Sequence, residues 1–78
     1  MKILESKSTS IGGHYWIIEH RGRLYELDLN VSDDRSAYRL WRAPKGAKCD
    51  EFLHNLERVL KPDARMLAAF IAMARLSV

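Results

Sequence analysis

The sequence predicts an α+β domain in which a three- or four-stranded antiparallel β-meander over residues 1–43 is followed by two C-terminal helices over 49–77. Two observations predict the sheet: segments rich in aromatic and aliphatic residues at 14–20 and 23–29 are separated by only two residues, and a third segment alternates at 37–42. Beyond it, apolar residues recur with helical spacing. With 78 residues, 47% of them hydrophobic, the chain suits a single folded domain, residues 1–78, whose helices pack on one face of the sheet.

The strongest local signal is a β-hairpin around Gly22. Only Arg21 and Gly22 separate the two apolar segments, and a two-residue turn requires the positive φ that glycine supplies. If His20 pairs with Arg23, alternation gives one largely apolar face, made of Trp16, Ile18, Tyr25, Leu27 and Leu29. The other face is mixed and carries Tyr15, Ile17, Glu19, Glu26 and Asp28. A slip of one residue would destroy this separation, so the pattern supports the register.

The third strand, 37–42, places Tyr38 and Leu40 on one face and Arg39 with Trp41 on the other. Pro44 ends it because proline has no N–H for the sheet. Between the second and third strands, residues 30–35 predict a loop in which Asp33 and Asp34 form the turn.

The N-terminal segment, residues 2–8, is compatible with a fourth strand that returns through Gly12 and Gly13. No predicted element is left to cover the mixed face of the sheet.

Two helices are predicted after the sheet. The first begins at Asp50 or Cys49, ends near Lys61 and has a stripe made of Phe52, Leu53, Leu56, Val59 and Leu60. Pro62 is expected at the first position of the second helix, and Asp63 places a negative charge near its N-terminus. The apolar surface of this helix is broad and comprises Met66, Leu67, Ala69, Phe70, Ile71, Met73 and Ala74. Such a helix is either deeply buried or faces a partner, which is a second copy in a homodimer through residues 63–76 or a different protein.

No catalytic residues, metal ligands or cofactor sites are predicted, so we expect a protein that is not an enzyme. Cys49 and His54 lie five residues apart and do not share a helix face well. His14 and His20 would lie about 20 Å apart along a strand, too far to bind one metal ion. Gly12-Gly13 lacks the further residues of a phosphate-binding loop.

The segment 35–48 contains five basic residues and no acidic one, with Tyr38 and Trp41 between them. Lysine and arginine neutralise phosphate charge, and an exposed tryptophan can stack on a base. The sequence therefore offers nucleic-acid binding as an alternative function, through Arg35, Arg39, Trp41, Arg42, Lys45 and Lys48. A net charge of only +3 argues against a strong general affinity for nucleic acid.

Protein binding is the leading expectation, because aromatic and arginine side chains on the mixed face are typical interface anchors. The expected contact residues are Tyr15, Ile17, Arg39, Trp41, Arg42 and Lys45. No motif assigns a family. In general character a compact, basic αβ domain without catalytic groups resembles small phage or mobile-element inhibitors of host complexes, anti-CRISPR proteins among them. That resemblance implies steric occlusion of a partner protein or ribonucleoprotein complex.

A cytoplasmic location is expected, without membrane insertion. Cys49 is the only cysteine, which excludes a disulfide within the chain. The N-terminal residues lack the apolar stretch of a signal peptide. The longest apolar run, 66–74, is much shorter than the roughly 20 residues that a membrane-spanning helix needs.

Overall fold

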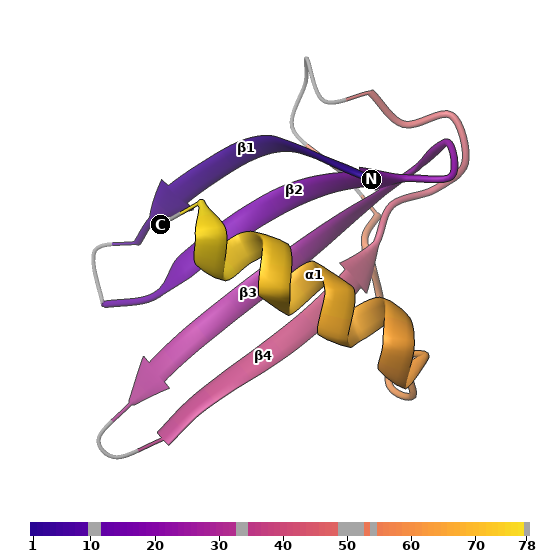
Figure 1. The fold of residues 1–78 in the computed structure, drawn as a ribbon. Coiled ribbons are helices and arrows are strands. Elements are labelled where there is room, and N and C mark those ends of the chain that lie inside the picture. The colour runs from indigo at the N-terminus through magenta and orange to yellow at the C-terminus, as the bar shows by residue number, and fades with distance from the viewer. Residues whose placement is uncertain (10–11, 33–34, 49–52, 54, 78) are drawn as a thin grey trace.

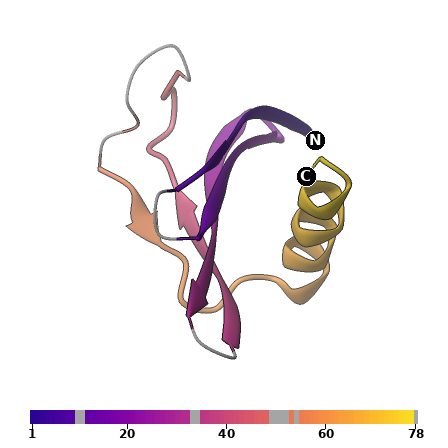
Figure 2. The same ribbon diagram turned by 90° about the vertical axis from the view of Figure 1, so that its left-hand side faces the viewer.

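A computed structural model describes residues 1–9, 12–32, 35–48, 53 and 55–77 of the chain (Figure 1). Five antiparallel strands form one sheet in which neighbours in sequence are neighbours in space. The strands are β1 (Lys2–Ser8), β2 (His14–His20), β3 (Arg23–Ser32), β4 (Arg35–Arg42) and β5 (Glu57–Arg58). The helix α1 (Ala64–Leu76) forms a second layer against one face of the sheet, as Figure 2 shows from the side.

The hairpin of β2 and β3 has the predicted register. His20 pairs with Arg23, Trp16 with Leu27 and His14 with Leu29. Arg21 and Gly22 have φ of 52° and 74°. Positive φ at both central residues is what a type I′ turn requires, and this turn matches the right-handed twist of the strands.

The N-terminal strand predicted over residues 2–8 is confirmed, and β1 pairs with β2 along its length with a bulge between Ile3 and Glu5. The predicted loop over 30–35 is wrong at both ends. β3 continues to Ser32, and β4 begins at Arg35, which pairs with Ser32. The polar residues of this segment favour a loop locally, yet backbone pairing continues through them as long as the opposite strand supplies partners. The predicted turn at Asp33 and Asp34 falls outside the described residues.

The second predicted helix is confirmed as α1. Its N-cap is Asp63, whose side chain accepts a hydrogen bond from the Arg65 N–H at 2.8 Å. Pro62, expected at the first helical position, lies one residue before the cap instead. A capping aspartate satisfies an otherwise unpaired amide, and this bond fixes where the helix begins.

The first predicted helix, 50–61, is wrong in the part that the structure describes. Glu57 and Arg58 form β5 against Arg42 and Trp41, and Asn55 has φ of 57°, which an α-helix does not contain. Residues 49–52 and 54, including Cys49 and Asp50, are outside the described residues. An isolated helix of this length is marginal in water. Here, pairing with the edge of β4 gives the backbone its hydrogen bonds instead.

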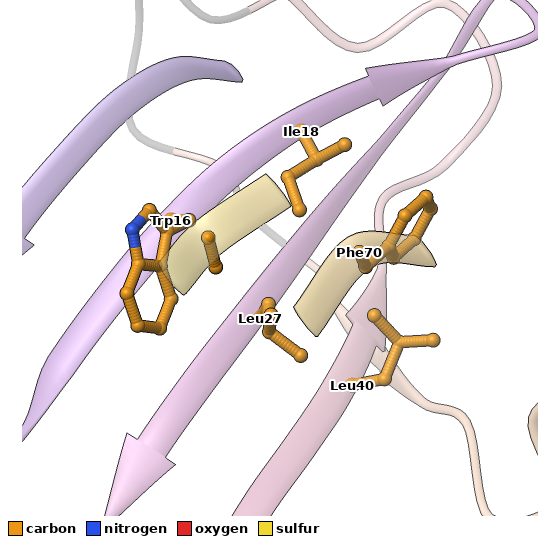
Figure 3. Packing of buried hydrophobic residues seen from close by; sticks show 6 residues of the cluster. Trp16, Ile18, Leu27, Leu40 and Phe70 are labelled. Carbon is orange, nitrogen blue, oxygen red and sulfur yellow. The ribbon is translucent and has the colours of Figure 1, made fainter. Parts of the chain in front are cut away.

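The core lies between α1 and the sheet (Figure 3). Its buried members are Trp16, Ile18, Leu27, Leu40, Phe70 and Ala74, and they come from three strands and the helix. Phe70 and Ala74 are four residues apart, so they share the helix face that meets the sheet. The indole N–H of Trp16 donates to the Ser77 Oγ at 3.0 Å, which ties β2 to the C-terminal end of α1.

Candidate functional site

The sheet face opposite α1, here called the outer face, carries two rows of side chains. The register places one row across all five strands: Glu5, Ile17, Glu26, Trp41 and Arg58. The adjacent row crosses four strands: Lys7, Tyr15, Asp28 and Arg39. Opposing residues in an antiparallel sheet point to the same side, so each row is a line of direct neighbours.

Trp41 is held in place from two sides. Its indole N–H donates to the Asp28 Oδ2 at 3.0 Å, and the Arg58 guanidinium carbon lies 5.5 Å from the centre of its ring. A cation over an indole face is attracted by the negative charge density of that face. The side chain is half-buried and ordered by these contacts. One ring face and the polar edge are therefore already occupied.

Glu26 lies between Ile17 and Trp41, and its environment raises the pKa of its carboxyl from 4.5 to about 7. Burial is the largest cause, because removing water disfavours the charged form. A hydrogen bond with Asp28 and the negative charges of Asp28 and Glu5 add to the effect on the pKa of Glu26. Asp28 lies two residues along the same strand, so both carboxyl groups share the outer face. Near neutral pH the Glu26 carboxyl can therefore take up or release a proton.

A shallow hollow of about 270 Å³ opens beside Glu26 and Asp28. It extends towards Thr9 and Gly13, in the connection between β1 and β2. Side chains of opposite charge contribute to it: the carboxyl groups of Glu26 and Asp28, and the exposed guanidinium of Arg39. Its lining residues are Thr9, Gly13, His14, Tyr15, Glu26, Asp28, Leu29, Asn30 and Arg39. Arg39 faces Asp28 in the register, but no ion pair joins them within the described residues. The Arg39 guanidinium therefore keeps its hydrogen-bond donors available.

The structure places three of the predicted contact residues on the outer face: Tyr15 and Arg39 line the hollow, and Trp41 is hydrogen-bonded to Asp28, which also lines it. Ile17 is on the same face but only 3% exposed, so it supports the surface and does not form it. Leu24 and Ala43 are buried at the same end of that face. The expectation that nothing covers the mixed face is thus wrong at its hairpin end, where the chain leaving β4 runs on the side away from α1 (Figure 2).

Arg42 lies on the other side of the sheet from Arg39 and Trp41, because β4 alternates its side chains. Its guanidinium donates to the Glu57 Oε2 at 3.0 Å and joins the ends of β4 and β5. Arg42 therefore does not belong to the outer face. Lys45 and Lys48 are exposed in the segment after β4, while the side chain of Arg35 is outside the described part of the chain.

Sequence reasoning did not identify Arg58 or the pairing of Glu26 with Asp28 as parts of the site. Arg58 falls within the predicted first helix but outside its apolar stripe, and nothing local in the sequence indicates that it lies over Trp41. The two acids could have been found, because their spacing of two on a predicted strand places both carboxyl groups on one face. The predicted register already set them beside Ile17 and Tyr15.

A second polar cluster lies on the α1 side of the sheet, where the His14 ring joins two serines. Its Nε2 is 2.6 Å from the Ser6 Oγ, and its Nδ1 is 3.2 Å from the Ser8 Oγ. A serine beside a histidine is the first requirement of a hydrolase site, but there a carboxylate usually stabilises the charged imidazole. Here the Ser8 hydroxyl, and not a carboxylate, is the second partner of the His14 ring. The cluster is best explained as a hydrogen-bonded link between β1 and β2.

Within the described residues, no group of three or more histidine, cysteine, aspartate or glutamate side chains is arranged to hold a metal ion. No helix in the same part of the chain is long and apolar enough to cross a membrane. Comparisons with protein-family models, with curated proteins and with solved structures found no match.

Proposed function

We propose that the protein is a small binding module, without catalytic activity of its own, that recognises another protein through the outer face of its sheet. One observation carries the proposal: Trp41, fixed by Arg58 and by Asp28, is hydrogen-bonded to a residue that lines the same hollow as Tyr15 and Arg39. Aromatic and arginine side chains dominate the energetics of protein interfaces. Side chains that are already ordered lose less conformational entropy on binding.

The charges of the outer face support a partner surface of mixed sign. Glu5, Glu26 and Asp28 lie on β1 and β3, whereas Arg39 and Arg58 lie on β4 and β5. Lys7, also on β1, is basic, but its ammonium group lies 3.8 Å from the Glu5 carboxylate and offsets that charge. A surface with this division selects its orientation, because a partner docked the wrong way meets like charges. A module of this kind acts by occupying its partner's surface, which is the steric mechanism of an inhibitor.

Two variants test the proposal against a matched control. Tyr15→Ala and Arg39→Ala remove side chains from the hollow, whereas Arg65→Ala removes an exposed arginine from α1, on the opposite side of the molecule. A partner identified by affinity purification should bind the Arg65→Ala protein as tightly as the unaltered one in titration calorimetry. Loss of a central interface anchor should weaken binding by about 2 kcal/mol, or roughly 30-fold in Kd.

If all three variants bound the partner equally weakly, or if none of them lost affinity for it, the outer face would be rejected as the binding surface. Circular dichroism of each variant shows whether the fold is retained. This check matters most for Tyr15→Ala, because Tyr15 is half-buried.

Nucleic-acid binding is a second candidate, favoured by the closeness of Arg39, Trp41 and Arg58 on β4 and β5 and by the exposed Lys45 and Lys48. The carboxylates beside Trp41 oppose it, since they repel phosphate. Affinity for a labelled 20-nucleotide single strand, measured by anisotropy from 50 to 200 mM salt, separates the two candidates. Phosphate contacts predict a steep fall in affinity, with a slope reduced by about one in Arg58→Ala. Protein recognition predicts weak binding that this variant does not change.

A further inference from the structure

β5 covers only one end of β4. The two strands pair at Trp41 with Arg58 and at Arg42 with Glu57, and the Val59 N–H then donates to the Leu40 oxygen at 2.9 Å. The chain next turns towards α1 (Figure 1). β4 itself begins at Arg35, so within the described residues no strand pairs with its outer edge from Arg35 to Arg39.

The backbone at this edge is directed outward. The Ala43 N–H donates to the Leu24 oxygen on β3, whereas the Leu40 oxygen accepts from β5. Main-chain groups of successive residues point to opposite sides of a strand. Counting back from Leu40, the N–H and C=O groups of Tyr38 and Ser36 point away from β3. They form a row of donors and acceptors suited to one more strand.

The opposite edge of the sheet differs in the features that discourage strand addition. β1 has a bulge between Ile3 and Glu5 and carries Lys2 and Lys7. Bulges and lysines are common protections of an exposed edge, because they distort it or keep it solvated. β4, in contrast, pairs with β3 without interruption from Arg35 to Arg42. Its regular edge is therefore the better template.

Charge decides between a second copy of this chain and a different partner. Two copies that pair antiparallel over the whole free edge would centre on Ala37 and set Arg35 of one copy opposite Arg39 of the other. Like charges in that position are destabilising. Arg39 is exposed on the outer face and has no ion pair within the described residues. An acidic side chain opposite Arg39 would be stabilising.

From these observations we propose that the free edge of β4, residues Arg35–Arg39, binds an extended segment of a partner protein as an added strand. Side chains of that segment alternate: acidic ones lie beside Arg39 on the outer face, and apolar ones lie beside the half-buried Tyr38 on the α1 side. The inference rests on the proposed function for the class of partner, and it adds where and how that partner is held.

Amide exchange in the free protein gives the first test. The Ser36 and Tyr38 N–H groups should exchange quickly by NMR, and the Ala37 and Arg39 N–H groups, which point to β3, should exchange slowly. Equal protection of all four would mean that the edge is already covered and would overturn the inference.

The second test uses a defined probe, a capped peptide Thr-Val-Glu-Val-Glu-Val-Thr, with the same peptide bearing lysine for glutamate as its control. The glutamate peptide should shift the amide signals of Ser36 and Tyr38 and slow their exchange. The lysine peptide should bind at least ten-fold more weakly, and Arg39→Glu should reverse that preference. Signal changes that map to β1, or no binding of either peptide, would contradict the inference.

Ser36→Pro removes one outward N–H, and proline is tolerated where the N–H faces solvent. Peptide affinity should fall at least ten-fold in Ser36→Pro and stay unchanged in Ser36→Ala, which keeps the N–H. If the proline variant fails to fold, the exchange pattern and the charge reversal at Arg39 still decide the matter.

The same variant distinguishes this inference from the proposed function. A protein partner that needs Tyr15 and Arg39 but binds Ser36→Pro normally would overturn the added strand and leave the outer face as the binding surface. Binding of the glutamate peptide at β4, combined with a partner that is insensitive to Tyr15→Ala and Arg39→Ala, would support the added strand and overturn the outer face.

Discussion

The two faces of the sheet arise from the same strands by simple alternation, yet they are stabilised in different ways. On the α1 side, Trp16, Ile18 and Leu27 pack against Phe70 and exclude water. On the outer face the central positions are held by Glu26, Asp28 and Trp41, through hydrogen bonds and charges. The first face depends on apolar area, which tolerates no polar group without a partner. The second leaves its polar side chains half-buried, with part of each still open to a partner.

This difference shows which residues serve the fold and which remain available for binding. Removal of an apolar side chain should cost most on the α1 side, while changes on the outer face should depend on pH or on the hydrogen bond that is lost. Four predictions test the contrast.

Phe70→Ala should have the largest effect. Phe70 is fully buried at 0% exposure and contacts the rings of Tyr25 and His20, with centroids 5.3 and 5.4 Å away. Loss of a buried phenylalanine typically lowers the free energy of unfolding by about 3 to 5 kcal/mol. Urea denaturation followed by circular dichroism measures it. A loss below about 1 kcal/mol would mean that α1 does not pack on the sheet as described.

Ile17→Ala should have the second-largest effect on stability. Ile17 is an exception to the contrast between the faces, since it is on the outer face but only 3% exposed. The expected loss in free energy of unfolding is about 2 kcal/mol or slightly more. Leu60→Ala is the control, because Leu60 is 81% exposed and its removal should change stability by less than about 0.5 kcal/mol. Equal effects of the two variants would show that Ile17 is open to solvent.

Glu26→Gln should stabilise the protein at pH 8 more than at pH 5. Folding raises the pKa of Glu26 from 4.5 to about 7, so the folded state binds more protons than the unfolded state between these values. The contribution of Glu26 to stability is therefore complete below pH 4.5 and is lost as the pH rises through about 7. Since Glu26 is partly exposed, solvent screening reduces the expected difference to about 1 kcal/mol.

Denaturation of both proteins at the two pH values measures this difference. Glu19→Gln, which changes an exposed glutamate on β2, should alter the free energy of unfolding little at either pH. If Glu26→Gln changed the free energy of unfolding equally at pH 5 and pH 8, the outer face would not raise the pKa of Glu26.

Trp41→Phe should have the smallest effect on stability, because it keeps an aromatic ring near Arg58 and loses only the hydrogen bond to Asp28. A net loss of about 1 kcal/mol or less is expected. The matched change, Trp16→Phe, also removes one hydrogen bond, from the indole N–H to Ser77. It leaves a gap in the core as well, so it should lower the free energy of unfolding more. The reverse order in thermal unfolding would mean that the outer face is the drier of the two.

The hairpin was predictable to the residue because its signals are local. A glycine turn sets the register, and the separation of apolar from mixed side chains excludes the alternatives. The second helix was predictable for the same reason, since Asp63 and the apolar spacing that follows both belong to α1. The predicted outer face therefore correctly included Tyr15, Arg39 and Trp41.

What sequence reasoning missed is non-local. The segment around Val59 has helical spacing, yet Glu57 pairs with Arg42, fifteen residues earlier, and Arg58 lies over Trp41. Local periodicity does not show that a strand edge is available for pairing. The pKa of Glu26 is likewise raised mainly by burial and to a smaller extent by Glu5, and both arise only when the strands have joined into the sheet. Both features of the site require the assembled sheet.

The bond from Trp16 to Ser77 also bears on how the protein is made. The ribosome synthesises the strands first, so Trp16, Ile18 and Leu27 have left the exit tunnel while α1 is still inside it. Until Phe70 and Ser77 emerge, these strand side chains lack the helix that covers them in the folded protein, so the core closes only when α1 arrives.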